Sequence, residues 1–195
     1  MDPHLYPWII LFAPLVAAAF ILFVLPRRNV AAGAVGILTA ALTCLLSWKV
    51  FLDPALAVTA QIPWIEVPGV FSVPIGIILD NLSRLMLVVV TTIATLVFIY
   101  SAGYMRGDEG IPRYYASLCL FLFSMLGIVL ADNLVMMFIF WELVGVSSYL
   151  LIGHYFRKDS AADAAKQAFT VNRVGDFGFI LGILMLWLAT GSIMF

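Results

Sequence analysis

The sequence predicts an all-α integral membrane protein, a polytopic bundle of six transmembrane helices with a short extracytoplasmic β-hairpin between helices two and three. Three observations predict it. Hydrophobic residues make up 64% of the 195 residues and charged residues only 11%, whereas soluble domains contain about 25% charged residues. Six stretches are apolar over about 20 residues, the length that crosses a hydrocarbon core. The segments between them carry the Pro, Gly and charged residues that end helices.

The first apolar run is long enough to be a retained transmembrane helix. No Lys or Arg precedes it, it is too long for the apolar region of a signal peptide, and the basic "PRRN" closes it. Five further runs follow, separated by "LDPA", by "MRGDEGIPR", by "ADN" and by "RKDSAADAAKQ". We therefore expect membrane-spanning helices at about 6–25, 30–51, 82–104, 114–130, 134–155 and 168–188.

The second connection has a composition that differs from the others. Its segment "AQIPWIEVPGVFSVPIGIIL" is rich in β-branched and aromatic residues and is broken by Pro68 and Gly69 near its centre. This pattern predicts a β-hairpin over about 55–78 on the outer surface, with prolines that limit it to edge pairing. Asp80 follows, with Ser83 three residues on, and we expect Asp80 to cap the third helix. A transport role for Asp80 is the alternative.

Orientation follows from the basic residues, which gather on the cytoplasmic side of membrane proteins. The first, third and fifth connections hold Arg and Lys, whereas the second and fourth hold none. We therefore expect the odd-numbered loops to be cytoplasmic and the N-terminus to be on the outer side.

The rest of the composition excludes several classes of function. A net charge of −1 gives no reason to expect nucleic-acid binding. Cys44 and Cys119 lie in apolar runs, outside any metal-binding spacing. The chain shows no phosphate-binding glycine loop and no haem or iron–sulfur ligand set, so we expect no cofactor and no metal in it. Without internal repeats or linkers, residues 1–195 are expected to form a single membrane unit.

Glu142 is an ionisable residue in the middle of an apolar helix. It follows Leu134 by eight residues, or about 12 Å, which is near the bilayer midplane. A carboxylate there costs several kcal/mol unless it faces protein, water or a counter-charge, or binds a proton. Two readings stay open: a proton carrier, or an acid that pairs with Arg or Lys to hold two helices together. Its helical face also carries two small and two larger residues, Gly145, Val146, Tyr149 and Gly153.

The expected sixth helix carries a polar stripe. Lys166, Arg173 and Asp176 fall on one side of a helical wheel, with Asn172 beside them. Arg173 and Asp176 are three residues apart and can pair within the helix. The functional reading is that the stripe lines a cytoplasmic half-channel in which Arg173 tunes Asp176. The alternative is a local ion pair that only keeps Arg173 solvated.

His154 lies at the cytoplasmic end of the expected fifth helix. Because its reference pKa is near 6.5, a histidine there can relay protons. The alternative is an interfacial residue beside Tyr155 and Arg157.

Three passages together resemble a known family: "LDNLSRLMLVVVTTIATLVFIYSAGYM" (79–105), "MMFIFWELVGVSSYLLIGHYF" (136–156) and "AAKQAFTVNRVGDFGFILGI" (164–183). They resemble the proton-pumping, antiporter-like subunits of respiratory complex I, the NADH:quinone oxidoreductase. The "AFTVNRVGDFGF" passage and the hairpin before "DNLSRLM" are most similar to the L subunit. Large subunits of multisubunit sodium/proton antiporters share the same core.

The resemblance implies roles for individual residues. Glu142 matches the family's fifth-helix glutamate, a proton site paired with a lysine on the seventh helix. Arg173 and Asp176 match the charged pair of its sixth helix, and nothing is carried over for His154. The family fold has two inverted five-helix bundles and a lateral helix. Its members are much longer, so this chain resembles only the N-terminal third, without the partner lysine.

Together these patterns favour a proton-translocating, antiporter-like, non-redox subunit of NADH:quinone oxidoreductase, which couples quinone reduction to proton pumping. The alternatives are the large subunit of a multisubunit sodium/proton antiporter and a non-pumping structural membrane module. The resemblance implies an energy-transducing membrane, the inner membrane in bacteria. It implies as partners the other membrane subunits of complex I, especially the adjacent antiporter-like subunit, together with lipids and protons. Flavin and iron–sulfur clusters are implied elsewhere in the complex.

Overall fold

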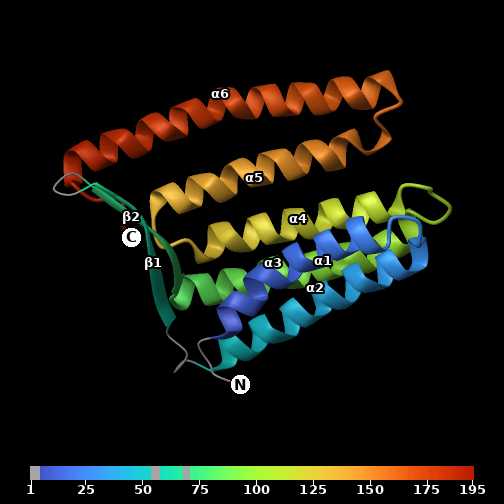
Figure 1. The fold of residues 1–195 in the computed structure, drawn as a ribbon, viewed down its shortest axis with the longest axis horizontal. Coiled ribbons are helices and arrows are strands. Elements are labelled where there is room, and N and C mark those ends of the chain that lie inside the picture. The colour runs from blue at the N-terminus through green and yellow to red at the C-terminus, as the bar shows by residue number, and fades with distance from the viewer. Residues whose placement is uncertain (1–4, 54–57, 68–70) are drawn as a thin grey trace.

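The computed structural model describes residues 5–53, 58–67 and 71–195. Figure 1 shows long helices lying side by side, with a two-stranded hairpin across one end. Six of the helices are long and apolar enough to cross a membrane, which confirms the expected fold class. The elements are α1 (Tyr6–Val24), α2 (Asn29–Leu52), β1 (Val58–Val67), β2 (Phe71–Leu79), α3 (Asn81–Tyr104), α4 (Ile111–Leu130), α5 (Leu134–Ile152), the 3₁₀ turn η2 (Gly153–Tyr155) and α6 (Asp159–Thr190).

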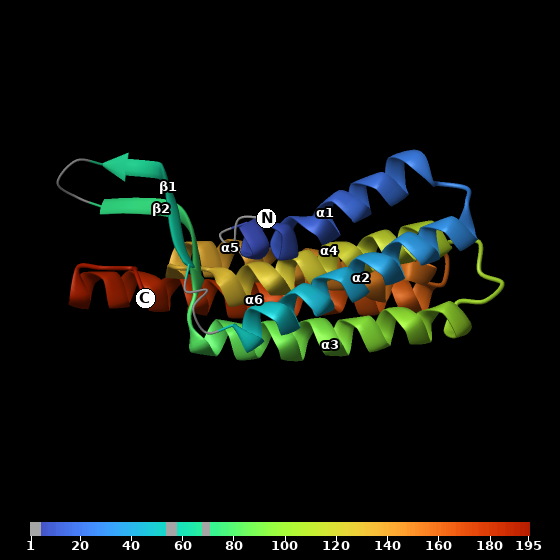
Figure 2. The same cartoon turned by 90° about the horizontal axis from the view of Figure 1, so that it is seen from below.

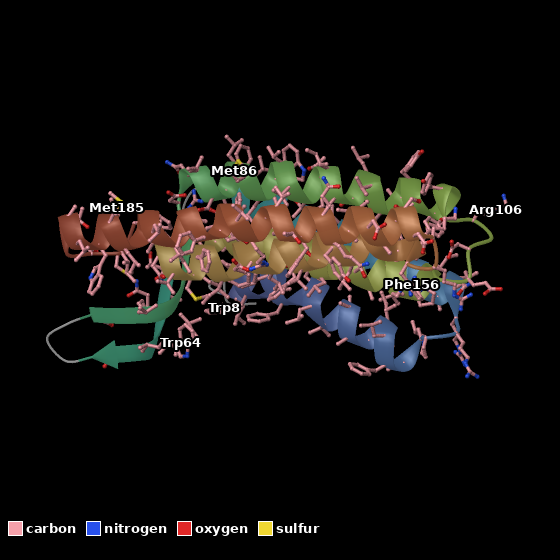
Figure 3. All side chains as sticks on the ribbon, turned by 90° about the horizontal axis from the view of Figure 1, so that it is seen from above. Trp8, Trp64, Met86, Arg106, Phe156 and Met185 are labelled. Carbon is pink, nitrogen blue, oxygen red and sulfur yellow. The ribbon has the colours of Figure 1, made fainter. Side chains whose placement is uncertain are left out.

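The two ends of the bundle differ in character. The first, third and fifth connections lie together at one end, which we call the basic end (residues 25–28, 105–110 and 153–158). The hairpin and residues 191–195 lie at the opposite end, which we call the hairpin end (Figure 2). Figure 3 places Arg106 and Phe156 at the basic end and Trp64 and Met185 towards the other.

Helix α4 is the centre of the bundle and contacts α1, α2, α3 and α5. Most of its surface is buried, whereas little of α6 is buried. Small residues make the close contacts possible. A Cβ at Gly127 of α4 would overlap the ring of Phe140 on α5, and a Cβ at Gly36 of α2 would lie 2.7 Å from the Tyr115 ring of α4. Backbones can approach this closely only where a side chain is missing.

Helix α5 ends at Ile152 instead of 155, and the 3₁₀ turn η2 completes the expected segment. Two helices begin well before the expected residue. Helix α6 begins at Asp159 rather than at 168, because the polar segment before the apolar run contains several alanines, the best helix formers. Asp159 also places a carboxylate in the first turn, where it stabilises the helix dipole. Helix α4 begins at Ile111 rather than at 114, with Pro112 in its first turn.

The predicted hairpin is present. Strands β1 and β2 are antiparallel, with Val58 opposite Leu79 and a register shift between Pro63 and Ile65. Both strands are edges of a two-stranded sheet, where proline is tolerated. The expected break at Pro68 and Gly69 lies outside the described residues.

Helix α3 starts at the predicted cap. The Ser83 N–H donates a 2.7 Å hydrogen bond to Asp80 Oδ1. This backbone hydrogen bond lowers the pKa of Asp80 below its ordinary value.

Asp132 anchors the hairpin to the helices. It lies, buried, between α4 and α5. Its Oδ2 accepts a 2.8 Å hydrogen bond from Gln61 of β1, and its Oδ1 accepts a 2.7 Å bond from Asn133. Gly76 of β2 lies against the same carboxylate, and a Cβ there would overlap it. Hairpin docking therefore depends on glycine at 76 and on a buried, fully partnered acid.

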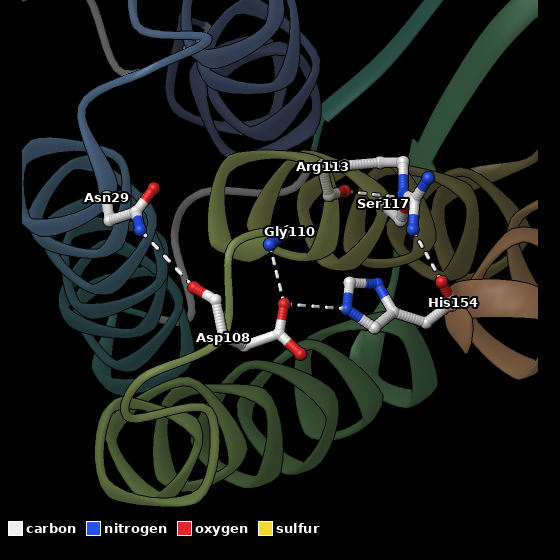
Figure 4. A network of polar contacts seen from close by, with 6 residues as sticks. All are labelled: Asn29, Asp108, Gly110, Arg113, Ser117 and His154. Atoms are coloured by element: carbon white, nitrogen blue, oxygen red, sulfur yellow. Dashed lines mark hydrogen bonds and ion pairs between the residues drawn. The ribbon is translucent and has the colours of Figure 1, made fainter. Parts of the chain in front are cut away.

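A polar network joins the three connections at the basic end (Figure 4). Asn29 donates a 3.3 Å hydrogen bond to the Asp108 carbonyl. Asp108 Oδ1 accepts a 2.5 Å bond from the Gly110 N–H and lies 3.4 Å from Nε2 of His154. Arg113 in turn donates a 2.5 Å bond to the carbonyl of His154. The network holds the starts of α2 and α4 against the end of α5.

Opposing effects act on the pKa of Asp108. Partial burial raises it, but hydrogen bonds from the Gly110 N–H, the Tyr155 hydroxyl and His154 lower it by more, so the pKa lies below its ordinary value. A depressed carboxyl pKa adds stability that is present above the unfolded-state pKa and is lost as the pH falls through the folded-state pKa.

We predict that Asp108→Asn removes this acid dependence. Wild-type protein should lose about 1 kcal/mol of stability as the pH falls below about 4, whereas the variant should lose less over the same range. Thermal unfolding in detergent at a series of pH values measures the difference. Glu109→Gln, at the exposed neighbouring acid, is the control and should keep the wild-type pH dependence. Parallel curves for wild type and Asp108→Asn would contradict the assignment.

We predict that Gly76→Ala destabilises the protein by about 1–3 kcal/mol, because the new methyl group must displace Asp132 from its partners. Gly103→Ala on α3 is the matched control, since a Cβ there has nothing within 4 Å. Urea unfolding of the two variants in the same detergent checks the difference. Equal stabilities would rule out close docking of β2 on Asp132.

Candidate functional site

The charged residues predicted within the membrane meet between α5 and α6, which lie side by side (Figure 1). Arg173 of α6 forms an ion pair with Glu142 of α5. The Nη1 atom of Arg173 also lies 3.5 Å from Oδ2 of Asp176, one helical turn further along α6. One guanidinium is therefore shared by two carboxylates from two helices. The predicted Arg173–Asp176 pair is present, and the alternative reading of Glu142 as an acid paired with an arginine describes a real contact.

Two aromatic side chains complete this cluster. The Trp141 indole N–H donates a 3.0 Å hydrogen bond to Oδ1 of Asp176. The Phe169 ring lies 4.6 Å from Cζ of Arg173, a cation–π distance. Asp176 is buried, whereas the side chains of Glu142 and Arg173 are 23% and 34% exposed. The acid held by the indole is thus the inner one, and Glu142 is the more accessible one.

Gly145 makes room for the arginine. A Cβ at this position would lie 3.3 Å from Nη2 of Arg173 and 3.9 Å from the amide nitrogen of Asn172. Two other residues of the predicted Glu142 face also meet α6, since the Tyr149 ring packs on Phe169 at 5.6 Å and Gly153 lies against Ala165. The predicted face of α5 therefore does face the polar stripe of α6.

Lys166 does not join the cluster. Its Nζ lies 3.4 Å from Oδ1 of Asp163, and both side chains are exposed. Lys166 instead lines a cavity of about 220 Å³ near the basic end, together with Arg113, Ser117 and Tyr149. Since Tyr149 contacts Phe169 and Phe169 contacts Arg173, an aromatic pair stands between this cavity and the cluster.

His154 belongs to the basic-end network. Its ring is buried, packed at 5.4 Å from the Tyr114 ring and 4.9 Å from the Tyr155 ring. Among the described residues, its polar side-chain contact is with Asp108. His154 packs on Tyr155, and the structure does not bring it to Glu142 or Asp176. The expectation that it is an interfacial residue stays a prediction.

Sequence reasoning missed Trp141 and Asp132. Trp141 directly precedes Glu142, and an indole N–H within an apolar helix needs an acceptor, so its presence was a usable signal. Asp132 lies between two spans, and only its tertiary contacts with the hairpin distinguish it from a loop acid.

The arrangement can bind one proton. One guanidinium and two carboxylates leave one negative charge when both acids are ionised. A single bound proton makes the cluster neutral, which removes most of the cost of placing charge at membrane depth. Among the residues that the structure describes, no group of three or more His, Cys, Asp or Glu could hold a metal ion.

Comparison with known families finds two matches. Residues 64–115 match the family described as NADH-ubiquinone oxidoreductase (complex I), chain 5 N-terminus. Residues 131–195 match the family described as the transmembrane region of NADH:quinone oxidoreductase and Mrp antiporters. The second match contains Glu142, Arg173 and Asp176. The antiporter-like membrane subunits of this family lack redox centres.

Curated relatives are similar over most of the chain. NAD(P)H-quinone oxidoreductase chain 5 of Synechocystis sp. is 57% identical over 124 residues, which are 64% of this chain and 18% of the relative. The chloroplastic subunit 5 of Adiantum capillus-veneris is 42% identical over 96% of this chain and 27% of its own length. NADH-quinone oxidoreductase subunit L of Rhodobacter capsulatus is 51% identical over 78% of this chain and 22% of its own. The chain thus spans about a quarter or less of these relatives' length.

Two solved structures share the fold. The Mrp complex from Dietzia sp. matches with a TM-score of 0.76 and 25% identity, over 95% of this chain and 20% of that one. An archaeal membrane-bound sulfane sulfur reductase matches with a TM-score of 0.74 and 19% identity, over 96% and 38%; at this identity the likeness shows the fold alone. With six apolar helices, the hairpin and the two family matches, the chain belongs to the chain 5/subunit L family of NADH:quinone oxidoreductase (complex I) and matches its N-terminal region.

Proposed function

We propose that this chain supplies part of the proton path of an antiporter-like membrane subunit that couples quinone reduction to proton pumping in NADH:quinone oxidoreductase. The observation that carries the proposal is the cluster in which Glu142 and Asp176 share Arg173. Family membership supports the complex, and the cluster supports the chemistry, because ionisable residues at membrane depth are functional by default.

In this proposal the arginine is a shared counter-charge. When Arg173 is drawn towards Asp176, Glu142 loses its partner and takes up a proton. When Arg173 returns to Glu142, that proton is released. The 3.5 Å distance to Asp176 and the direct ion pair with Glu142 support such an exchange, since a small movement of one side chain is enough to change partners.

We propose that protons reach the cluster from the basic end. The cavity beside Lys166 and Tyr149 supports this direction. The Tyr149–Phe169 pair then separates the cavity from Arg173 and limits leakage. The contacts of His154 favour a role in holding the basic end over a role as relay.

The proposed setting follows the positive-inside rule. The basic end faces the cytoplasm and the N-terminus the outer side of an energy-transducing membrane, the inner membrane in bacteria. The partners are the other membrane subunits of complex I, especially the adjacent antiporter-like subunit. Flavin and iron–sulfur clusters reside in other subunits.

Glu142→Gln tests the proton carrier. In the assembled complex the variant should pump fewer protons per quinone reduced, because a neutral amide cannot exchange protons. Proton uptake and quinone reduction measured together in inverted vesicles give this ratio. Glu66→Gln, at an exposed acid of the hairpin, is the control. Undiminished pumping with normal quinone reduction would reject the assignment.

Trp141→Phe tests the inner acid. The variant keeps an aromatic ring but loses the N–H donor to Asp176, a charge-assisted hydrogen bond worth roughly 1.5 kcal/mol or more. We expect about a tenfold slower proton translocation with normal assembly. Trp48→Phe on α2 is the matched control. If both variants pump at the wild-type rate, the hydrogen bond does not contribute.

Two alternatives rest on specific observations. The shared fold and the second family match favour a sodium/proton antiporter as the second candidate; sodium-dependent proton movement in vesicles would support it. The ion pair between α5 and α6 favours a structural module as the third. In that case neutral variants of Glu142, Arg173 and Asp176 impair assembly and leave ion movement per assembled complex unchanged.

A further inference from the structure

A cavity of about 350 Å³ opens at the basic end, away from the Glu142 cluster. Its wall comes from three connections: Pro26 after α1, the segment before α4, and the turn between α5 and α6. Figure 4 shows part of this wall, with Asp108, Arg113 and His154. Its volume is within the range of small-ligand sites.

The Arg and Lys side chains of this wall have N–H groups that remain available to donate hydrogen bonds. The carboxylate of its inner acid, Asp108, already has its partners. Asp108 is occupied by the Gly110 N–H, the Tyr155 hydroxyl and His154. Arg113 uses one N–H on the His154 carbonyl and stacks on Phe156 at 4.7 Å, which leaves further N–H groups available.

Arg157 and Lys158, in the turn between α5 and α6, make fewer polar contacts than Arg113 among the described residues. Lys158 has its Nζ 5.2 Å from the Tyr155 ring. Among the described residues no carboxylate pairs with Arg157 or Lys158. Glu109 is the other acid of the wall and is exposed. The cavity thus offers three cations against one free carboxylate, a balance that suits an anion.

The position of the cavity relative to the bilayer indicates which class of anion it can bind. It lies where α4 and α6 begin and where the apolar span of α5 ends. Phe156 in its wall is an apolar side chain that is 55% exposed. A ligand here meets cations on one side and hydrocarbon on the other, which is the environment of a lipid headgroup.

We propose that this cavity binds the phosphate of an anionic phospholipid from the leaflet at the basic end. Arg113, Arg157 and Lys158 hold the phosphate, and Phe156 contacts the glycerol and the first carbons of the chains. Bound lipid joins the turn between α5 and α6 to the membrane surface. The site shares Arg113 and Phe156 with the smaller cavity beside Lys166, whereas Arg157 and Lys158 line this cavity and not the smaller one.

Photocrosslinking in the full-length protein within its membrane complex tests the site. The complex is reconstituted into phosphatidylcholine vesicles with a small fraction of photoactivatable phosphatidylglycerol, and labelled peptides are mapped by mass spectrometry. We expect labelling at residues 150–158 and at least a fivefold loss in the double variant Arg157→Gln, Lys158→Gln. The double variant Arg27→Gln, Arg106→Gln removes equal charge from the same end outside this cavity and should keep labelling within twofold.

Competition distinguishes the sources of phosphate. Unlabelled phosphatidylglycerol should suppress labelling, whereas millimolar inorganic phosphate should not. Suppression by inorganic phosphate would overturn the lipid assignment in favour of a free anion. Equal labelling by photoactivatable phosphatidylcholine, or an equal loss in the two double variants, would show only diffuse attraction and would overturn the site. Labelling is normalised to assembled complex, so a folding defect is not counted as lost binding.

Discussion

In hydrocarbon a polar group without a partner costs several kcal/mol, and this constraint determines both the helices and the charged cluster. Glu142, Arg173, Asp176 and Trp141 pair with one another across α5 and α6. Among the described residues, Nε of Arg173 alone in this cluster is buried without a hydrogen-bond partner. The Phe179 ring packs at 5.7 Å on Trp141 and at 5.6 Å on Phe138, which places apolar surface beside the cluster. The cluster therefore joins two helices and, in the proposed function, also keeps one negative charge for a proton.

The need of buried polar groups for partners also stabilises the two ends of the bundle. Asp132 at the hairpin end and Asp108 at the basic end each collect donors from segments far apart in the chain. Between them α4 is packed on four helices, and close approach at Gly127 and Gly36 leaves it little freedom. A rigid scaffold with its titratable cluster at the less buried α5–α6 side suits a site in which side chains, not helices, move.

The fold does not determine the function, because complexes as different as a sulfane sulfur reductase and an Mrp complex share it. What distinguishes a proton path from a structural ion pair is the excess of acid over base in the cluster. The cluster holds two carboxylates and one guanidinium, and in the proposed function this excess of one acid is what takes up a proton. Glu142 is the more exposed of the two acids and Asp176 the more buried, which supports Glu142 as the acid that exchanges the proton.

The sequence by itself determined the helices, the hairpin and the Asp80 cap, because apolar run length, β-branched content and capping residues act locally. It also predicted the Arg173–Asp176 pair, which helix geometry dictates. Only the tertiary structure decided that Arg173 reaches Glu142, that Trp141 holds Asp176, that Lys166 stays outside and that His154 is buried against Asp108. Those outcomes depend on how α5 and α6 are rotated and packed, which no periodicity within one helix specifies.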